Sequence, residues 1–201
     1  MMMERRAFLA AAAAATGTSL AGCAGMGMGG GWVTLVDGAT MKNLDGWGQL
    51  GEGNWSITEG TLQGKDGKLG YLVTPVSYSD FEMRVEFWAD GPANSGIFIR
   101  CQDAKKVGAD NAYEVNIFDK RPDPSYGTAA IVDFAKAPMP YPQAANRWNT
   151  FEITAKGDHL VVVFNGQKTV DIRNDKHRSG PVALQSAGGT IRFRKVQIRT
   201  I

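Results

Sequence analysis

The residues best suited to chemistry lie in one short segment, YEVNIFD at residues 113–119. Aromatic and β-branched residues alternate there with other types at period two, which predicts a β-strand over residues 112–118. Successive side chains of a strand point to opposite faces, so Glu114 and Asn116 share one face and Val115 lies on the other. A carboxylate and an amide in mid-strand, with no run of solvating charges, indicate the floor of a binding groove.

The spacing of polar groups in this segment also resembles an acid pattern, the Glu-x-Asp-x-x-Glu signature of laminarinase-like β-glucanases. A retaining glycosidase needs two carboxyl groups about 5 Å apart. Here Asn116 replaces the middle acid, and Asp119 faces away from Glu114 unless a β-bulge intervenes. These departures argue against simple retaining hydrolysis.

Arg100 is the second candidate for chemistry. It ends a predicted strand over residues 97–100, which follows a turn at residues 94–96. On such a strand Arg100 shares a face with Phe98, where a guanidinium can recognise a polar planar group or stabilise an enolate-like oxyanion. The alternative is an ion pair between Arg100 and Glu114 on the neighbouring strand, which would not exclude a binding role.

The other reactive residue types suggest no metal, cofactor or covalent chemistry. His159 and His177 have no histidine partner at metal-ligand spacing, although a calcium site built from scattered oxygens stays open. Cys101 adjoins the apolar residues 97–99, which favours a buried structural thiol over a nucleophile. No nucleophile elbow, phosphate-binding loop or dinucleotide fingerprint is present.

The first 23 residues resemble an export signal rather than part of the fold. RRAFL at residues 5–9 resembles a twin-arginine signal, and residues 10–15 form an apolar run of alanines. This apolar run is too short for a membrane-spanning helix. We therefore expect residues 1–23 to be a signal peptide of an exported protein.

The end of this signal indicates a lipid anchor. LAGC at residues 20–23 resembles the bacterial lipoprotein lipobox, in which the thiol of Cys23 is lipidated. The alternative is an ordinary secretory signal cut near Ala21 or Ala24. Residues 24–31 are rich in glycine and are expected to form a flexible tether. The expected location is therefore the periplasm or the cell envelope, with membrane contact only through Cys23.

Composition and turn signals predict one all-β domain over residues 32–201. The net charge of +2 gives no electrostatic case for nucleic acid, and most of the 25 glycines punctuate short apolar runs. The clearest alternation lies at residues 81–88, and Asn165-Gly166 is a strong hairpin signal. The pattern indicates a two-sheet antiparallel sandwich or jelly roll, with long loops over 120–145. Further strands are predicted at 32–36, 54–58, 61–63, 71–74 (ending at Pro75), 148–155, 159–165, 168–172, 181–185 and 190–201.

The order of motifs along the chain is more specific than any one of them. The motifs are LVDG at 35–38 with LDGW at 44–47, WSITEG at 55–60, DFEMRVEF at 80–87, NSGIFIR at 94–100, YEVNIFD at 113–119, WNT at 148–150, NG at 165–166 and LQ at 184–185. In this order they resemble the 3-keto-disaccharide hydrolase domain family, long catalogued as domain of unknown function 1080. The resemblance spans roughly residues 32–201.

The resemblance implies a concanavalin A-like jelly roll that cleaves 3-keto-glycosides or 3-keto-disaccharides. A ketone at carbon 3 acidifies the proton on carbon 2, so that a base can remove it, the group on carbon 1 can leave, and water can add. In these roles Glu114 would be the base and Arg100 would stabilise the enolate, without a cofactor. Asn116 and Asp119 would orient the sugar hydroxyls. The further candidate substrate contacts are Asn94, Ser95, Phe98, Trp88 and Gln185.

One position departs from the family pattern. Family members often read Leu-Gln-x-His-Gly where this chain has LQSAG at residues 184–188, so that Ala187 stands in place of a histidine. If that histidine were the base, this chain would lack it. The alternative function is therefore a non-catalytic glycan-binding module of the cell envelope, and a third is a structural envelope protein.

Overall fold

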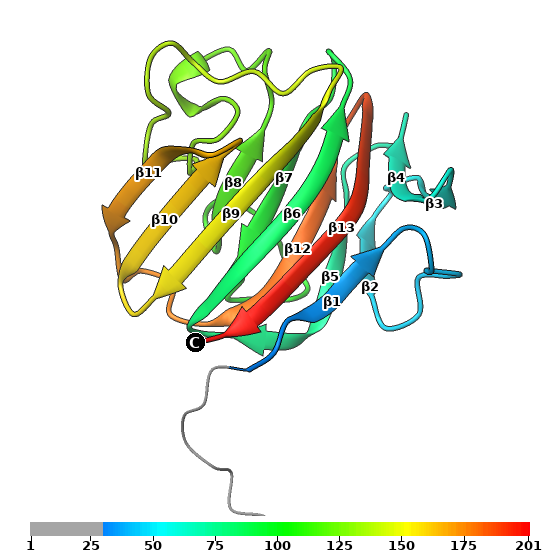
Figure 1. Cartoon of the computed structure of the whole chain (residues 1–201), viewed down its shortest axis with the longest axis horizontal. Coiled ribbons are helices and arrows are strands. Elements are labelled where there is room, and N and C mark those ends of the chain that lie inside the picture. Colours follow the sequence, from blue (N-terminus) through cyan, green and yellow to red (C-terminus); the bar gives the residue numbers. More distant parts are fainter. Residues whose placement is uncertain (1–29) are drawn as a thin grey trace, which may run out of the picture.

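The computed structural model describes residues 30–201, which fold into two antiparallel β-sheets (Figure 1). The expected signal peptide, Cys23 and tether residues 24–29 lie outside the described residues. The elements are β1 (Val33–Asp37), β2 (Gly48–Gly51), β3 (Trp55–Thr58), β4 (Thr61–Lys65), β5 (Gly70–Tyr78), β6 (Phe81–Ala89), β7 (Ser95–Ile99), β8 (Tyr113–Ile117), η1 (a 3₁₀ helix, Pro124–Tyr126), β9 (Trp148–Lys156), β10 (His159–Phe164), β11 (Gln167–Arg173), β12 (Gly180–Ser186) and β13 (Thr190–Thr200).

The two sheets form a sandwich with the core between them. The eight-stranded sheet has the order β11-β10-β9-β6-β13-β4-β3, with β1 also paired to β13, and the five-stranded sheet has the order β2-β5-β12-β7-β8. Figure 1 shows β9, β6 and β13 in front of β8, β7 and β12. Alternate residues of β6 from Phe81 to Phe87, and of β8 from Tyr113 to Ile117, belong to the core. The predicted all-β sandwich is confirmed, as are the alternation at residues 81–88 and the placement of Glu114 and Val115 on opposite faces.

Two strand predictions need correction. We expected β5 to end at Pro75, yet the strand continues through it, and its register with β12 shifts at this point. Proline has no N–H to donate, and the Thr74 hydroxyl accepts the N–H of Val182 (3.0 Å) beside it. Strand β2 was not predicted, because its sequence GQLG carries one apolar residue and no alternation.

The long excursion between β8 and β9 begins at Asp119, and its far end is hydrogen-bonded back to the carboxylate of the same residue. The Asp119 carboxylate accepts the Thr128 hydroxyl at 2.5 Å and the backbone N–H groups of Ala144 and Ala145, each at 2.9 Å. These bonds close residues 119–145 into a loop whose two ends meet.

Within residues 30–201, no helix is long and apolar enough to cross a membrane.

Part of this excursion lies along the free edge of β8. The N–H of Asn116 donates to the carbonyl of Ala130, and the N–H of Val132 donates to the carbonyl of Glu114, both at 3.0 Å. This part of the predicted long loops forms no named strand and makes only isolated bridges around Ile131. The segment nevertheless covers the edge of β8 and fixes the surroundings of Glu114.

Candidate functional site

The outer face of the five-stranded sheet brings polar residues from distant parts of the chain into one row. Cross-strand pairing places Leu50, Tyr71, Gln185, Gly96 and Asn116 side by side, in the order β2, β5, β12, β7 and β8. Neighbouring strands lie about 4.8 Å apart, so the row crosses the whole sheet. Three of its members carry hydrogen-bonding groups and one has no side chain.

The adjacent row contains Glu114. Phe98 pairs directly with Glu114, and Ala183 pairs with both Phe98 and Val73. Three of these four residues are apolar, and Phe98 is fully buried beneath the surface of this face. Glu114 is therefore a carboxylate at the end of an apolar row.

Gly96 gives the Glu114 carboxyl its place. A Cβ atom on Gly96 would lie 3.2 Å from both Cγ and Oε1 of Glu114, and 3.4 Å from the carbonyl oxygen of Val115. The carboxyl of Glu114 thus reaches one strand inward, from β8 to a position over β7. It occupies space that is open because residue 96 has no side chain.

The Glu114 carboxyl is poorly solvated and only weakly compensated. The residue is 7% exposed, and within residues 30–201 no hydrogen bond or ion pair holds its carboxyl. Burial raises the pKa of Glu114 to about 7, the charge of Arg121 opposes this rise, and the charge of Asp133 adds to it. At neutral pH the group is therefore divided between its acid and base forms.

Tyr71 and Gln185 form a polar pair in the row. The Gln185 Nε2 group donates to the Tyr71 hydroxyl at 3.4 Å, and the Gln185 Oε1 atom is buried without a partner among the described residues. An unpaired buried amide oxygen costs free energy unless water or a ligand supplies a donor. Gln185 therefore keeps the position expected of a substrate contact, and it has an acceptor available.

Asn116 divides its amide between the loop and the sheet face. Its Nδ2 group donates to the carbonyl of Tyr126 at 2.7 Å, while Oδ1 has no partner among the described residues. The side chain is fully buried. One end of the amide therefore positions the loop around η1, and the other end remains free to accept.

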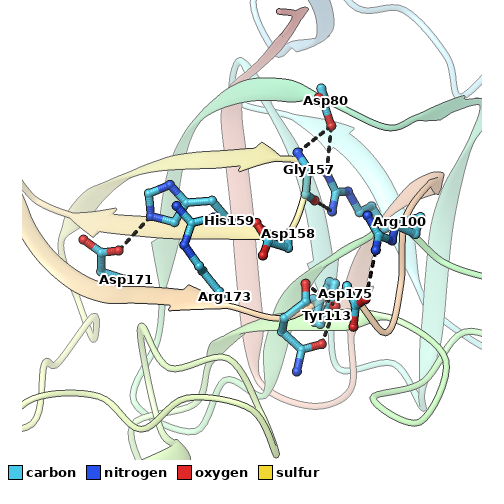
Figure 2. A network of polar contacts seen from close by, with 11 residues as sticks. Asp80, Arg100, Tyr113, Gly157, Asp158, His159, Asp171, Arg173 and Asp175 are labelled. Atoms are coloured by element: carbon cyan, nitrogen blue, oxygen red, sulfur yellow. Dashed lines mark hydrogen bonds and ion pairs between the residues drawn. The ribbon is translucent and has the colours of Figure 1, made fainter.

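Arg100 does not join Glu114, and both the predicted ion pair and the predicted shared face with Phe98 are wrong. The backbone of Arg100 has φ of 55°, a left-handed conformation in which the chain leaves strand β7. The strand alternation is broken there, and the guanidinium forms its ion pair with Asp80 at 3.2 Å. Figure 2 shows Arg100 directed toward Asp80 and Gly157.

The buried Arg100 side chain connects three turns. Its guanidinium donates to the carbonyls of Ser79 (2.8 Å), Gly157 (2.7 Å) and His177 (3.3 Å). The Asp80 carboxylate also accepts the N–H of Gly157 at 2.9 Å. The side chain is 0% exposed and its donors are used within the protein. We assign Arg100 to holding the two sheets together at one end of the sandwich.

Three predicted substrate contacts also lie away from Glu114 or have other partners. Trp88 lies on the outer face of the other sheet, where it pairs with Trp148 and where the Arg192 guanidinium lies 5.3 Å from its ring centre. The Ser95 hydroxyl donates to the carbonyl of Gln185 at 2.7 Å and is buried. Asp119 uses both carboxylate oxygens in its loop. The structure does not bring these three side chains to the Glu114 site.

Asn94 and Ala187 lie together at the end of the site. The N–H of Ala187 donates to the carbonyl of Asn94 at 2.9 Å, and the N–H of Asn94 donates to the carbonyl of Gly188 at 3.1 Å. Asn94 comes two residues before Gly96 and Ala187 comes two residues after Gln185, so each lies one residue outside its strand, at the same end of β7 and β12. The position at which the family pattern carries histidine is thus next to Gly96 and Gln185.

A pocket of about 290 Å³ opens on the same face beyond Tyr71. Its lining is mainly apolar and comes from β2, β5, the start of β12 and the loop after β7. Leu50 and Val73, the neighbours of Tyr71 on this face, form part of the wall. The lining residues are Gly48, Leu50, Val73, Thr74, Pro75, Ser77, Ala104 and Pro181.

The remaining reactive residues form no second centre in the described chain. Among residues 30–201, no group of three or more His, Cys, Asp and Glu side chains could hold a metal ion. The ring of His159 bonds to Asp171 at 2.8 Å (Figure 2), and His177 is buried against Tyr113. Cys101 is 1% exposed, and burial raises the pKa of its thiol to about 12, which confirms the interpretation as a structural thiol.

Sequence reasoning missed three residues that surround Glu114. Tyr71 was recognised only as part of a strand, because its pairing with Gln185 joins positions 114 residues apart. Arg121 and Asp133 lie in the long loop, where no periodic pattern in the sequence indicates which way a side chain points. Their charges act on Glu114 only because the loop is closed against β8.

Comparison with known proteins agrees with this architecture. A protein from Parabacteroides distasonis ATCC 8503 assigned as a glycosyl hydrolase has a TM-score of 0.73 and 16% identity, over 85% of this chain and 94% of that chain. The carbohydrate-binding module CBM66 from Bacillus subtilis has a TM-score of 0.60 and 20% identity, over 80% of this chain and 99% of that chain. A Bacillus subtilis protein of unknown function with a galectin-like fold has a TM-score of 0.61 and 13% identity, over 86% of this chain and 98% of that chain.

These likenesses show a concanavalin A-like jelly roll, a fold shared by enzymes and binding modules. No curated protein matches the chain. The sequence model of one domain family matches residues 31–199, which is nearly the whole described part. The chain therefore belongs to the family of 3-keto-alpha-glucoside-1,2-lyase-like domains.

Proposed function

We propose that this protein cleaves 3-keto-glycosides, with Glu114 as the base that removes the proton on carbon 2. The observation that carries the proposal is the buried Glu114 carboxyl, which lies over Gly96 without an ion-pair partner among the described residues. Its pKa of about 7 is suited to proton transfer near neutral pH. An ion pair with Arg100 would have lowered this basicity, and Arg100 is committed to Asp80 instead.

The charge that opposes the negative enolate is then supplied by the loop. Arg121 is the cation in this loop whose charge opposes the rise in the pKa of Glu114. We assign to Arg121 the stabilising role that was expected of Arg100. The amide oxygens of Gln185 and Asn116 are buried without a partner among the described residues, and a sugar hydroxyl that reached them would supply the missing donor.

The proposal is tested by incubating the mature protein with 3-keto-trehalose and with a 3-keto-glucoside. We expect glucose or the aglycone to be released faster than in the spontaneous reaction. Chromatography of the products measures this release. The absence of release from both substrates would exclude this activity.

Ala187 supports a second candidate, a glycan-binding module without catalysis. Ala187, where the family pattern described above implies histidine, bonds to Asn94 next to the polar row and has only a methyl group. Saturable binding of a 3-keto sugar by calorimetry, without turnover, would favour this candidate. A structural envelope protein would show neither binding nor ligand-dependent thermal stabilisation.

Replacing Gly96 with Ala should impair cleavage while leaving the fold intact. The new methyl group would lie 3.2 Å from the Glu114 carboxyl and would displace it by a few tenths of an ångström. Small misplacements of a catalytic group can lower the rate by about 100-fold. We expect kcat/KM to fall about 10- to 100-fold, with unfolding in urea changed by about 1 kcal/mol or less.

Gly91 offers a matched control for this change, because no atom lies within 4 Å of the position of its added Cβ. Gly91→Ala should retain the wild-type rate. Full activity of Gly96→Ala would contradict the placement of the reacting carboxyl over residue 96.

A further inference from the structure

Tyr71 is a buried phenol that the proposed function does not yet use. It is 8% exposed, and its ring contacts the ring of Phe98 edge-to-face at a centre-to-centre distance of 5.3 Å. This contact and the pairing with Gln185 fix the direction of the ring. Its hydroxyl is therefore held at one place in the polar row.

The hydrogen bond to Gln185 leaves the phenolic proton free. Gln185 Nε2 is the donor and the Tyr71 oxygen is the acceptor, at 3.4 Å. Each hydroxyl has one proton to donate and can still accept. The Tyr71 proton is thus available to another acceptor in the row.

The Tyr71 hydroxyl and the Glu114 carboxyl reach toward each other across the sheet. The carboxyl extends from β8 over Gly96 of β7, and the phenol extends from β5 to Gln185 of β12. Strands β7 and β12 are neighbours, about 5 Å apart. Two catalytic groups held over these strands could therefore act on adjacent atoms of one sugar ring. Burial raises the pKa of Tyr71, the Gln185 bond opposes this rise, and the charge of Glu114 adds to it.

The apolar pocket begins beside Tyr71, toward the β2 edge of the sheet and away from Glu114. Its wall includes Leu50, which pairs with Tyr71, and from there it continues along β5 as far as Ser77. A glycoside with carbon 2 at Glu114 would therefore direct its carbon 1 oxygen toward Tyr71. Its aglycone would extend toward the pocket.

We propose that Tyr71 is the general acid that protonates the leaving oxygen on carbon 1, acting with Glu114 as the base. This assignment rests on the proposed function, because it presumes cleavage of a 3-keto-glycoside. Loss of the proton from carbon 2 to Glu114 forms the enolate. The enolate electrons then form the bond between carbons 1 and 2 as the carbon–oxygen bond breaks, and the departing oxygen takes the proton of Tyr71.

Addition of water restores both groups. The Tyr71 phenolate removes a proton from water as the water oxygen bonds to carbon 1. Protonated Glu114 then returns a proton to carbon 2, and the ketone is regenerated. The two steps sum to hydrolysis, and they need no oxidant, reductant or further reactant.

The test compares Tyr71→Phe with the wild type on methyl, phenyl and 4-nitrophenyl 3-keto-glucosides. A poor leaving group needs protonation and a good one does not, so the variant should lose about 100-fold or more on the methyl glycoside. It should lose only a few-fold on the 4-nitrophenyl glycoside. Exchange of the carbon 2 proton in D₂O, followed by mass spectrometry, should persist in Tyr71→Phe.

Two controls separate the proposals. Tyr78→Phe removes a phenol at the other end of β5 and should behave as the wild type throughout. A wild-type rate for Tyr71→Phe, or an equal loss on all three substrates, would overturn the role of Tyr71 alone. A wild type that neither cleaves these substrates nor exchanges carbon 2 would overturn the proposed function together with it.

Discussion

Glu114→Gln should be inactive and, at pH 8, more stable than the wild type. Gln has nearly the same shape as Glu but can neither take the carbon 2 proton nor carry a buried charge. The pKa of Glu114 rises from 4.5 to about 7 on folding. At pH 8 the buried charge therefore destabilises the folded state by at most about 3 kcal/mol. Chemical unfolding of both proteins at several pH values measures the difference.

The sign of this effect follows from the direction of the shift. Because the folded pKa lies above the unfolded one, the native state binds more protons between pH 4.5 and 7, and stability falls as pH rises through this range. The advantage of Glu114→Gln should therefore disappear near pH 4. The rate of the wild type should rise with pH through about 7, as the base ionises.

A different result for Glu114→Gln would be informative. Cleavage at the wild-type rate would assign the base to another residue. A variant that is less stable at pH 8 would show that the carboxylate has a stabilising partner, and the burial of Glu114 would then need another explanation.

Arg100→Met should be strongly destabilised, with a loss of about 3–5 kcal/mol in the free energy of unfolding. Met fills much of the same volume but donates no hydrogen bond. The carbonyls of Ser79, Gly157 and His177 would each lose a donor within a buried region. Urea unfolding, compared with the wild type, measures the loss.

Arg173 provides the matched control, because it forms an ion pair with Asp158 at 2.7 Å but its side chain is 71% exposed. Arg173→Met should change stability by less than about 1 kcal/mol. If Arg100→Met kept its stability and lost only its activity, the catalytic role first expected of Arg100 would be restored.

Local periodicity predicted most of the strands and the faces of the strongest ones. Phe81 to Phe87 and Tyr113 to Ile117 alternate without interruption, and each set belongs to the core. For the same reason Glu114 and Asn116 were placed on one face of their strand and Val115 on the other. The structure confirms these placements because a strand within a sheet has only two faces.

The remaining site residues depend on information that periodicity does not contain. Arg100 breaks the alternation because its backbone adopts φ of 55°, and its side chain bonds to three carbonyl groups that lie far away in the sequence. Trp88 lies on the outer face of β6, and the sequence could not indicate which sheet contains that strand. Tyr71 and Gln185 meet only through the pairing of β5 with β12.

The closure of residues 119–145 at Asp119 makes this excursion an exchangeable unit. Its ends meet at one carboxylate, so a replacement of different length could be inserted without moving β8 or β9. The same unit carries Arg121 and Asp133, whose opposite charges add to the larger effect of burial on the pKa of Glu114. Relatives could therefore retune the working pH of one unchanged sheet by exchanging a single loop.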